Sequence, residues 1–242
     1  MWPHSITVGV GGKAISVGTD TPEVIATLDP WRIHDVGEPV DYCLELEPAA
    51  LGGAGQPRPL PGLYHGSTAL LRSRDTARLT TAFLRVLNSH ARPAGDGQVR
   101  IGLMPVVRDG VALLAPPASI GAVPDRWLVA QGIEAVYTVS SLVDAGRGQV
   151  LVDPPLGSDD QPVAPAFGGW WLPPQHWDGE LSPGFAVAEV MTLVADITAA
   201  NAASALRAVA TLVERVHPAF APSTVAAVKD SLATALERAA SP

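Results

Sequence analysis

Strand-like apolar runs alternate with amphipathic helical segments along this chain of 242 residues, and the alternation limits the folds open to it. Two β-like runs, residues 5–10 and 13–18, flank the turn dipeptide Gly11-Gly12 and predict a β-hairpin. Residues 75–90 place apolar side chains three or four positions apart, which predicts a helix. We therefore expect a mixed α/β fold in which helices flank a mixed sheet.

The remaining elements are predicted from the same two periodicities. Asp109-Gly110 lies between the apolar runs 99–107 and 111–115, and an Asp-Gly turn between such runs predicts a second hairpin. Further strands are predicted over residues 40–47, 67–73, 133–139 and 149–153, and further helices from Pro22, over residues 124–131, and on both sides of a break at 218–222.

Residues 154–183 are rich in Gly and Pro, and this composition predicts a long irregular loop. The segment holds three of the six tryptophans, Trp170, Trp171 and Trp177. Aromatic side chains on a loop either present a binding surface or fill the core beneath the loop, and the sequence leaves both interpretations open. All three are candidate residues for binding a peptide or a partner.

Composition restricts the class of protein further. Apolar residues make up 47% of the chain and charged residues 17%, so the chain can bury enough apolar surface to fold. No apolar stretch approaches the roughly 20 residues that span a bilayer, and the first four residues do not resemble a signal peptide. A single cysteine, Cys43, forms no internal disulfide. We expect a cytoplasmic protein without a membrane partner.

Charge is distributed unevenly along the chain. The formal net charge of −8 argues against a nucleic-acid partner. Residues 51–108, however, carry eight arginines and two acidic residues. This basic region is either the footprint of an anionic partner or a set of solvated arginines. Its candidate partner-binding side chains are Arg72, Arg74, Arg78 and Arg85.

The motifs that would carry catalysis are incomplete. Residues 9–14 read GVGGKA and contain the pair Gly12-Lys13. A phosphate-binding loop that ends in this pair would need Gly at position 7 and Ser or Thr at position 14, where the chain has Thr7 and Ala14. Cys43 shares its strand face with acidic residues, which disfavour the thiolate. None of the six histidines lies three or four residues from another, so no helical metal-binding pair exists. No metal or cofactor is expected.

From residue 65 onward, the order of the elements resembles a known family. Residues 65–75 precede the predicted helix, and residues 106–117 read as a strand, an Asp-Gly turn and a second apolar strand. This order resembles the region that leads into the nucleotide site of HPr kinase-like proteins, which also occur as accessory enzymes in peptide natural-product clusters. The resemblance covers about residues 20–155 and implies a kinase-like α/β core.

The chain departs from that family where a kinase needs its charged groups. The family loop has the form P-G-x-S-G-x-G-K-S-T, whereas residues 115–124 read APPASIGAVP. Only two lysines exist, Lys13 in the predicted hairpin and Lys229 in a predicted helix. Residues 137–143, YTVSSLV, lack the family's acidic residue. Since phosphoryl transfer needs Lys and Mg²⁺ to neutralise the triphosphate, we expect a pseudokinase to which no functional residue of the family carries over.

Two functions remain. The sequence favours a non-catalytic HPr kinase-like protein that binds a peptide substrate or a partner enzyme of peptide natural-product biosynthesis. The alternative is an enzyme that modifies a peptide by other chemistry in the same cleft, with scattered groups such as His65, Asp109, His176 and Asp178. The alternative requires two or more of these side chains within hydrogen-bond distance of one another in a pocket.

Three parts of the chain are expected. Residues 1–64 would form a strand-rich α+β region, residues 65–198 the kinase-like core, and residues 199–242 a helical pair, either separate or in one continuous domain. The thirteen alanines between residues 202 and 240 favour close packing of these helices. A homodimer contact through the same helices is the alternative.

Overall fold

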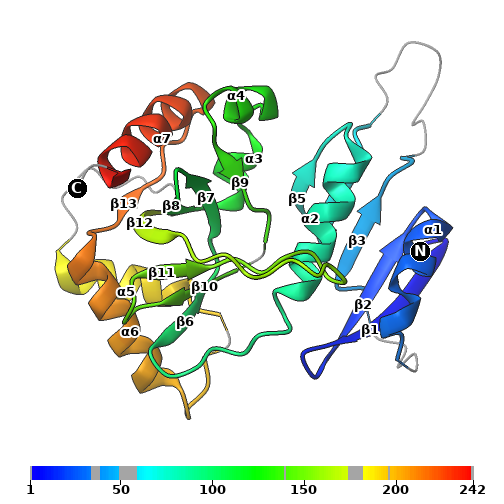
Figure 1. Ribbon diagram of the computed structural model, residues 1–242, viewed down its shortest axis with the longest axis horizontal. Helices are drawn as coiled ribbons and strands as arrows, with labels where there is room; N and C mark the ends of the chain where they lie inside the picture. Colours follow the sequence, from blue (N-terminus) through cyan, green and yellow to red (C-terminus); the bar gives the residue numbers. More distant parts are fainter. Residues whose placement is uncertain are drawn as a thin grey trace. The chain divides into compact units, whose positions relative to one another are not determined.

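The computed structural model describes residues 2–33, 39–48, 59–138, 140–173, 182–195 and 197–240. The chain divides into two compact units, coloured along the sequence in Figure 1. Unit 1 comprises residues 1–93 with 155–159, and unit 2 comprises residues 94–154 with 160–242. The boundary expected after residue 64 lies inside a β-hairpin of unit 1, and the boundary expected after residue 198 lies within unit 2.

Unit 1 is built on a five-stranded sheet with the order β1-β2-β3-β4-β5. The predicted hairpin around Gly11-Gly12 is confirmed, because β1 pairs antiparallel with β2 and both glycines have positive φ. β3 is parallel to β2, and the other pairs are antiparallel. The strands are β1 (His4–Val10), β2 (Lys13–Thr19), β3 (Tyr42–Glu45), β4 (Gly62–His65) and β5 (Thr68–Arg72).

Helices complete unit 1. The helix predicted over residues 75–90 is confirmed as α2 (Thr76–Asn88), whose first turn is capped where the Arg78 N–H donates to Asp75 Oδ1 at 3.0 Å. Its apolar stripe, which includes Leu79 and Phe83, is buried. The helix predicted from Pro22 is α1 (Pro22–Leu28), and the 3₁₀ turn η1 (Asp29–Trp31) follows it.

Unit 2 is built on a second sheet with the order β6-β10-β11-β12-β8-β7-β9, and β13 pairs with β12. The hairpin predicted at Asp109-Gly110 is confirmed, since β7 pairs antiparallel with β8 and both turn residues have positive φ. The strands are β6 (Gln98–Ile101), β7 (Met104–Arg108), β8 (Val111–Ala115), β9 (Glu134–Ala135), β10 (Ser141–Asp144), β11 (Gln149–Leu151), β12 (Ala166–Leu172) and β13 (Ala219–Phe220).

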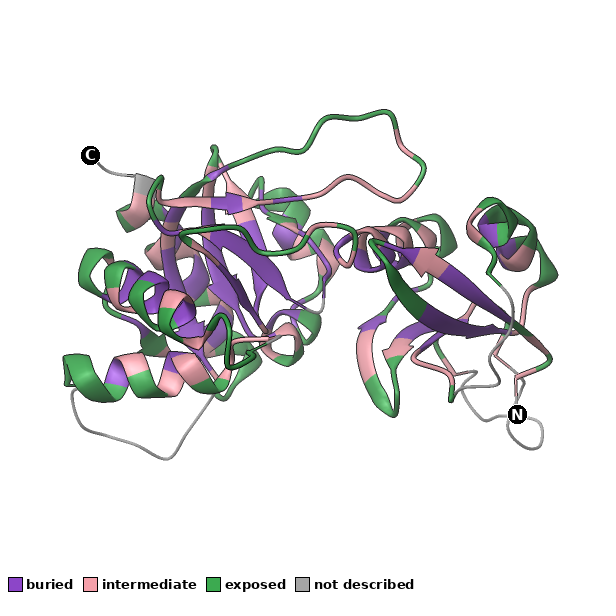
Figure 2. Cartoon of the chain, turned by 90° about the horizontal axis from the view of Figure 1, so that it is seen from below, coloured by how far each residue is buried: buried purple, intermediate pink, exposed green. Residues whose placement is uncertain are grey.

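Helices cover both faces of the sheet in unit 2 (Figure 1). On β8, Ala112 and Leu114 belong to one core cluster with Val209 of α6, whereas Leu113 faces the side on which α7 packs. Figure 2 shows the strands buried between helices whose outer sides are exposed. The helices are α3 (Pro117–Gly121), α4 (Asp125–Ala130), α5 (Pro183–Thr192), α6 (Ala202–Arg215) and α7 (Val225–Ala240).

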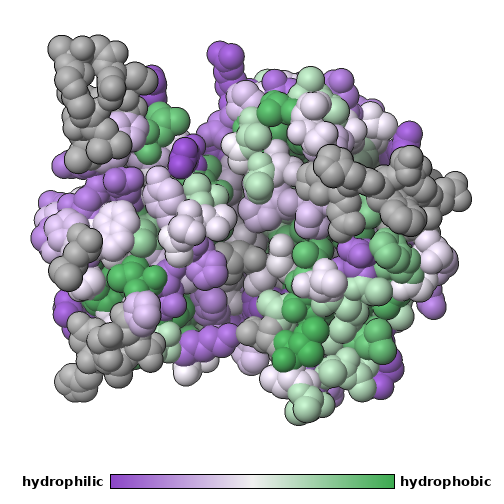
Figure 3. All heavy atoms as spheres, turned by 180° about the vertical axis from the view of Figure 1, so that it is seen from behind, coloured by the Kyte–Doolittle hydropathy of each residue, from purple (hydrophilic) through white to green (hydrophobic). Residues whose placement is uncertain are grey.

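The two C-terminal helices predicted from the sequence are present, but each packs mainly on other elements. α6 contacts α5 and β6, while α7 contacts β8 and β12. Apolar side chains are exposed on the α5 and α6 side, where Phe185 is 37% and Leu206 48% exposed, and Figure 3 shows apolar surface over this part of unit 2. A homodimer contact through these helices stays a prediction.

The prediction of an irregular loop over residues 154–183 is wrong for the central part of that segment. Residues 166–172 form β12, which lies between β11 and β8. Trp170 and Trp171 are 2% and 5% exposed, so they do not stand on an exposed loop. Gly168-Gly169 interrupts the apolar alternation, and the β12–β8 register shifts at the same place, which is why periodicity did not reveal the strand. Trp177 lies outside the described residues.

Gly168 lets α7 approach β12 closely. A Cβ on Gly168 would lie 2.4 Å from Val111 Cγ1 and 2.7 Å from Ala239 Cβ of α7. Neither separation is compatible with normal van der Waals contact, so α7 or β8 would have to shift. The packing of α7 therefore depends on a residue without a side chain at position 168.

Gly168→Ala should lower the free energy of unfolding of unit 2 by about 1–3 kcal/mol, because the methyl group overpacks the α7–β12 contact. Urea denaturation followed by tryptophan fluorescence measures the change. The matched control is Gly184→Ala in α5, where nothing lies within 4 Å of the added methyl group, so stability should stay the same or rise. Equal stability of Gly168→Ala and the unmodified chain would contradict the packing account.

Candidate functional site

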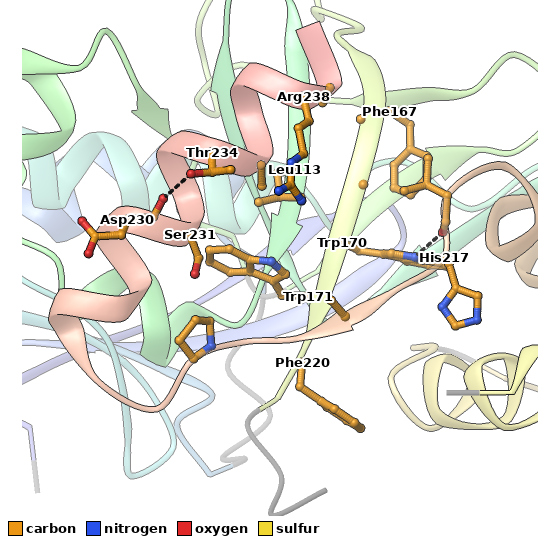
Figure 4. A pocket seen from close by; sticks show the side chains of 17 residues that line it. Leu113, Phe167, Trp170, Trp171, His217, Phe220, Asp230, Ser231, Thr234 and Arg238 are labelled. Atoms are coloured by element: carbon orange, nitrogen blue, oxygen red, sulfur yellow. Dashed lines mark hydrogen bonds between the residues drawn. The ribbon is translucent and has the colours of Figure 1, made fainter. Parts of the chain in front are cut away.

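Unit 2 contains a pocket of about 780 Å³ between β12, β13 and α7, which we call the β12–α7 pocket (Figure 4). Its volume is within the range of small-molecule and cofactor pockets, which measure about 300–1,000 Å³. Trp171 supplies aromatic wall on the side of α7, where Ser231 and Arg238 supply polar groups, and the Phe220 side chain lies on the other side of β13 (Figure 4). The pocket lies wholly within unit 2.

The local sequence opens this pocket in two ways. The register of β12 shifts at a bulge between Phe167 and Gly169. Gly168 and Gly169 line the pocket at this place and have no side chains that would fill it. After α6, β13 pairs in parallel with the end of β12, and the Ala221 N–H donates to Leu172 O at 2.8 Å. Pro222 then ends this extended stretch, and α7 begins at Val225.

Trp170 and Trp171 point to opposite faces of β12, as successive strand residues do. The Trp170 indole N–H donates to Val216 O at 2.9 Å, and its ring meets Phe167 edge to face at 5.3 Å. Figure 4 shows Trp171 on the other side of the strand, together with Ser231 and Arg238. Trp170 thus anchors the strand in the core, while Trp171 forms pocket wall.

Polar groups in the β12–α7 pocket lack acceptors. The Trp171 indole N–H and the Arg238 guanidinium have no hydrogen-bond or ion-pair partner within the described part of the chain. Trp171 and Arg238 can only donate hydrogen bonds. The Thr234 hydroxyl donates to Asp230 O at 2.9 Å, and the Asp230 side chain points away from β12 in Figure 4. The pocket lining therefore carries one guanidinium and one carboxylate, and on the side of β12 it offers the Trp171 and Arg238 donors beside aromatic surface.

Arg238 and Ser231 were not among the candidate residues predicted from the sequence. They are seven positions apart, so they lie on the same side of α7 about two turns from each other. That spacing was the only sequence signal available, and it does not distinguish a pocket wall from a solvated helix face. Trp171 was predicted, although for an exposed loop rather than a buried strand.

The predicted arginines all lie in unit 1, whereas Trp170 and Trp171 lie in unit 2. The Arg72 guanidinium lies 5.9 Å from the centre of the Tyr64 ring, in a cation–π contact. Arg74 lines a second pocket of about 650 Å³ within unit 1, beside Leu46 and Pro61. Arg78 and Arg85 are half-buried on α2. The predicted binding set is therefore divided between the two units.

The groups named for the alternative enzyme lie in separate parts of the chain. His65 is on β4 of unit 1 and Asp109 is in the β7–β8 turn of unit 2, while His176 and Asp178 lie outside the described ranges. His65 instead stacks on Tyr42, with ring centres 4.9 Å apart. The Tyr42 hydroxyl lies 2.9 Å from His90 Nε2, and burial, with a smaller effect from Asp41, raises the pKa of Tyr42 above its usual range.

The segment after β8 has the wrong backbone chemistry to hold a phosphate. Pro116 and Pro117 have no N–H, whereas a phosphate-binding loop uses successive backbone N–H groups. The N–H groups of Ser119 and Ile120 are bonded to Pro116 O at 3.0 and 3.3 Å. Lys229 lies on α7 with its Nζ 5.9 Å from the centre of the Trp127 ring. Within the ranges described, no three His, Cys, Asp or Glu side chains form a candidate metal site.

Cys43 should react slowly with thiol reagents. Burial is the largest influence and raises the pKa of the thiol, and the Glu45 carboxylate raises it further, against a hydrogen bond from Trp2. At neutral pH the folded protein should react with Ellman's reagent about tenfold or more slowly than the protein unfolded in guanidinium chloride. Because Cys43 is the single cysteine, the signal is unambiguous. Equal rates would contradict the buried, protonated thiol.

No helix in the described part of the chain is both long and apolar enough to cross a membrane. Comparisons of the chain with protein-family models, with curated proteins and with solved structures find no match. The function has to be inferred from the chemistry of the residues themselves, and the β12–α7 pocket is the place where unsatisfied donors, positive charge and aromatic surface meet.

Proposed function

We propose that the chain is a non-catalytic binding protein whose β12–α7 pocket holds a segment of a peptide substrate or of a partner enzyme. One observation carries the proposal. The Trp171 indole N–H and the Arg238 guanidinium face the same pocket without an acceptor among the residues described. A ligand that brings acceptor oxygens and an apolar group would satisfy both the donors and the aromatic wall.

A peptide has both of these features. Its carbonyl or carboxylate oxygens accept hydrogen bonds, and its side chains provide apolar surface. Tryptophan and arginine are also the residue types that contribute most to binding energy at protein interfaces. We assign Arg72, Arg74, Arg78 and Arg85 of unit 1 to a second surface that contacts an acidic partner.

The lost phosphate loop favours binding over phosphoryl transfer. A kinase needs backbone N–H groups and a lysine at the triphosphate, and Pro116-Pro117 provides no N–H at two successive positions. The order of strands and turns in the sequence is the support for proposing a degenerate HPr kinase-like protein. We place it as an accessory component of peptide natural-product biosynthesis.

Selection from a random peptide library, followed by calorimetric titration of the selected peptides and of ATP with Mg²⁺, tests the proposed function. We expect peptides to bind and Arg238→Ala to weaken them about tenfold or more, since a hydrogen bond to a charged group contributes about 1.5–3 kcal/mol. The control is Arg207→Ala, an exposed arginine of α6 outside the pocket. Micromolar ATP binding, or peptide binding that Arg238→Ala leaves unchanged, would contradict the proposal.

A further inference from the structure

The donors of the β12–α7 pocket converge from two elements. Trp171 belongs to β12, while Ser231 and Arg238 belong to α7. Side chains on a helix lean toward its N-terminus, so the long Arg238 side chain leans toward the turn that carries Ser231. In Figure 4 the guanidinium lies above the Trp171 indole, with Ser231 beside the ring. The three donors therefore line the same side of one pocket.

Beside β12 the charged side chain is Arg238, since the Asp230 carboxylate, which also lines the pocket, points away from that strand (Figure 4). Arginine is always charged and presents N–H groups in a planar fork that matches the two oxygens of a carboxylate. Among the described residues Arg238 forms no ion pair, so its charge is available to a ligand. One guanidinium balances one carboxylate, whereas a nucleotide triphosphate would require several cations.

The surroundings of these donors define the group next to the carboxylate. Leu113, Ala219 and Pro222 line the pocket together with the buried ring of Trp171. These walls favour an apolar group, because burying a charged or polar side chain there would cost its hydration without a partner. The matching ligand has a carboxylate and, next to it, a side chain that is aromatic or branched aliphatic.

We propose that the β12–α7 pocket recognises the terminal carboxylate of a ligand with an adjacent apolar side chain, as in the C-terminus of a peptide. This inference rests on the proposed function and makes it more specific. In the bound state Arg238 would hold both carboxylate oxygens, and the Trp171 N–H and the Ser231 hydroxyl would donate to the oxygens left open.

Fluorescence anisotropy with N-terminally labelled peptides selected for binding tests the inference. Each peptide is made with a free C-terminus and as the C-terminal amide. We expect amidation to weaken binding about tenfold or more, because the amide has no charge and brings a donor toward other donors. In Arg238→Ala, the free and amidated forms should bind equally, whereas Arg207→Ala should keep the difference. Competition by N-acetylphenylalanine would show whether a small carboxylic acid is sufficient or whether more of the peptide is required.

Two further variants separate recognition from folding. Arg238→Lys keeps the charge but loses the planar fork, so it should keep part of the preference for the free carboxylate. Trp171→Phe keeps the aromatic wall and removes the N–H, so it should weaken the free form more than the amide. Circular dichroism confirms that each variant folds. Equal binding of free and amidated peptides to the unmodified chain would overturn the inference and leave the proposed function intact, whereas binding of neither form would overturn both.

Discussion

The close approach of α7 to β12 is the constraint on which the rest of the site depends. It is possible only because position 168 lacks a side chain, since a Cβ there would lie 2.7 Å from Ala239 Cβ. With α7 in this place, Ser231 and Arg238 lie beside the indole of Trp171. A shift of the helix would move Ser231 and Arg238 relative to the buried indole of Trp171.

The hydrogen bond from Trp170 to Val216 O holds the other side of the same strand. Because neighbouring residues of a strand face opposite ways, fixing Trp170 in the core directs Trp171 toward α7. The segment that accepts this bond continues into β13 and then into α7. One buried indole therefore connects the strand and the helix that form the pocket, which gives Trp170 a positioning role and Trp171 a role in contact with the ligand.

Local signals in the sequence were sufficient for part of this structure. Gly11-Gly12 and Asp109-Gly110 marked their hairpins, and the apolar period marked α2, because each depends on residues close together in the chain. β12 could not be recognised in this way. Its parallel partner β8 lies some fifty residues earlier, and the glycines that admit α7 also remove the alternation that identifies a strand.

Both tryptophans line the β12–α7 pocket, and we infer that the Trp171 N–H, rather than the bonded Trp170 N–H, faces the ligand. An NMR titration of ¹⁵N-labelled protein with a selected peptide measures it, with the two indole N–H signals assigned from Trp170→Phe and Trp171→Phe. We expect the Trp171 signal to shift as its N–H gains an acceptor, and the Trp170 signal to change little because its N–H already donates to Val216 O. Peptide binding that leaves the Trp171 signal unmoved would contradict the assignment of the site.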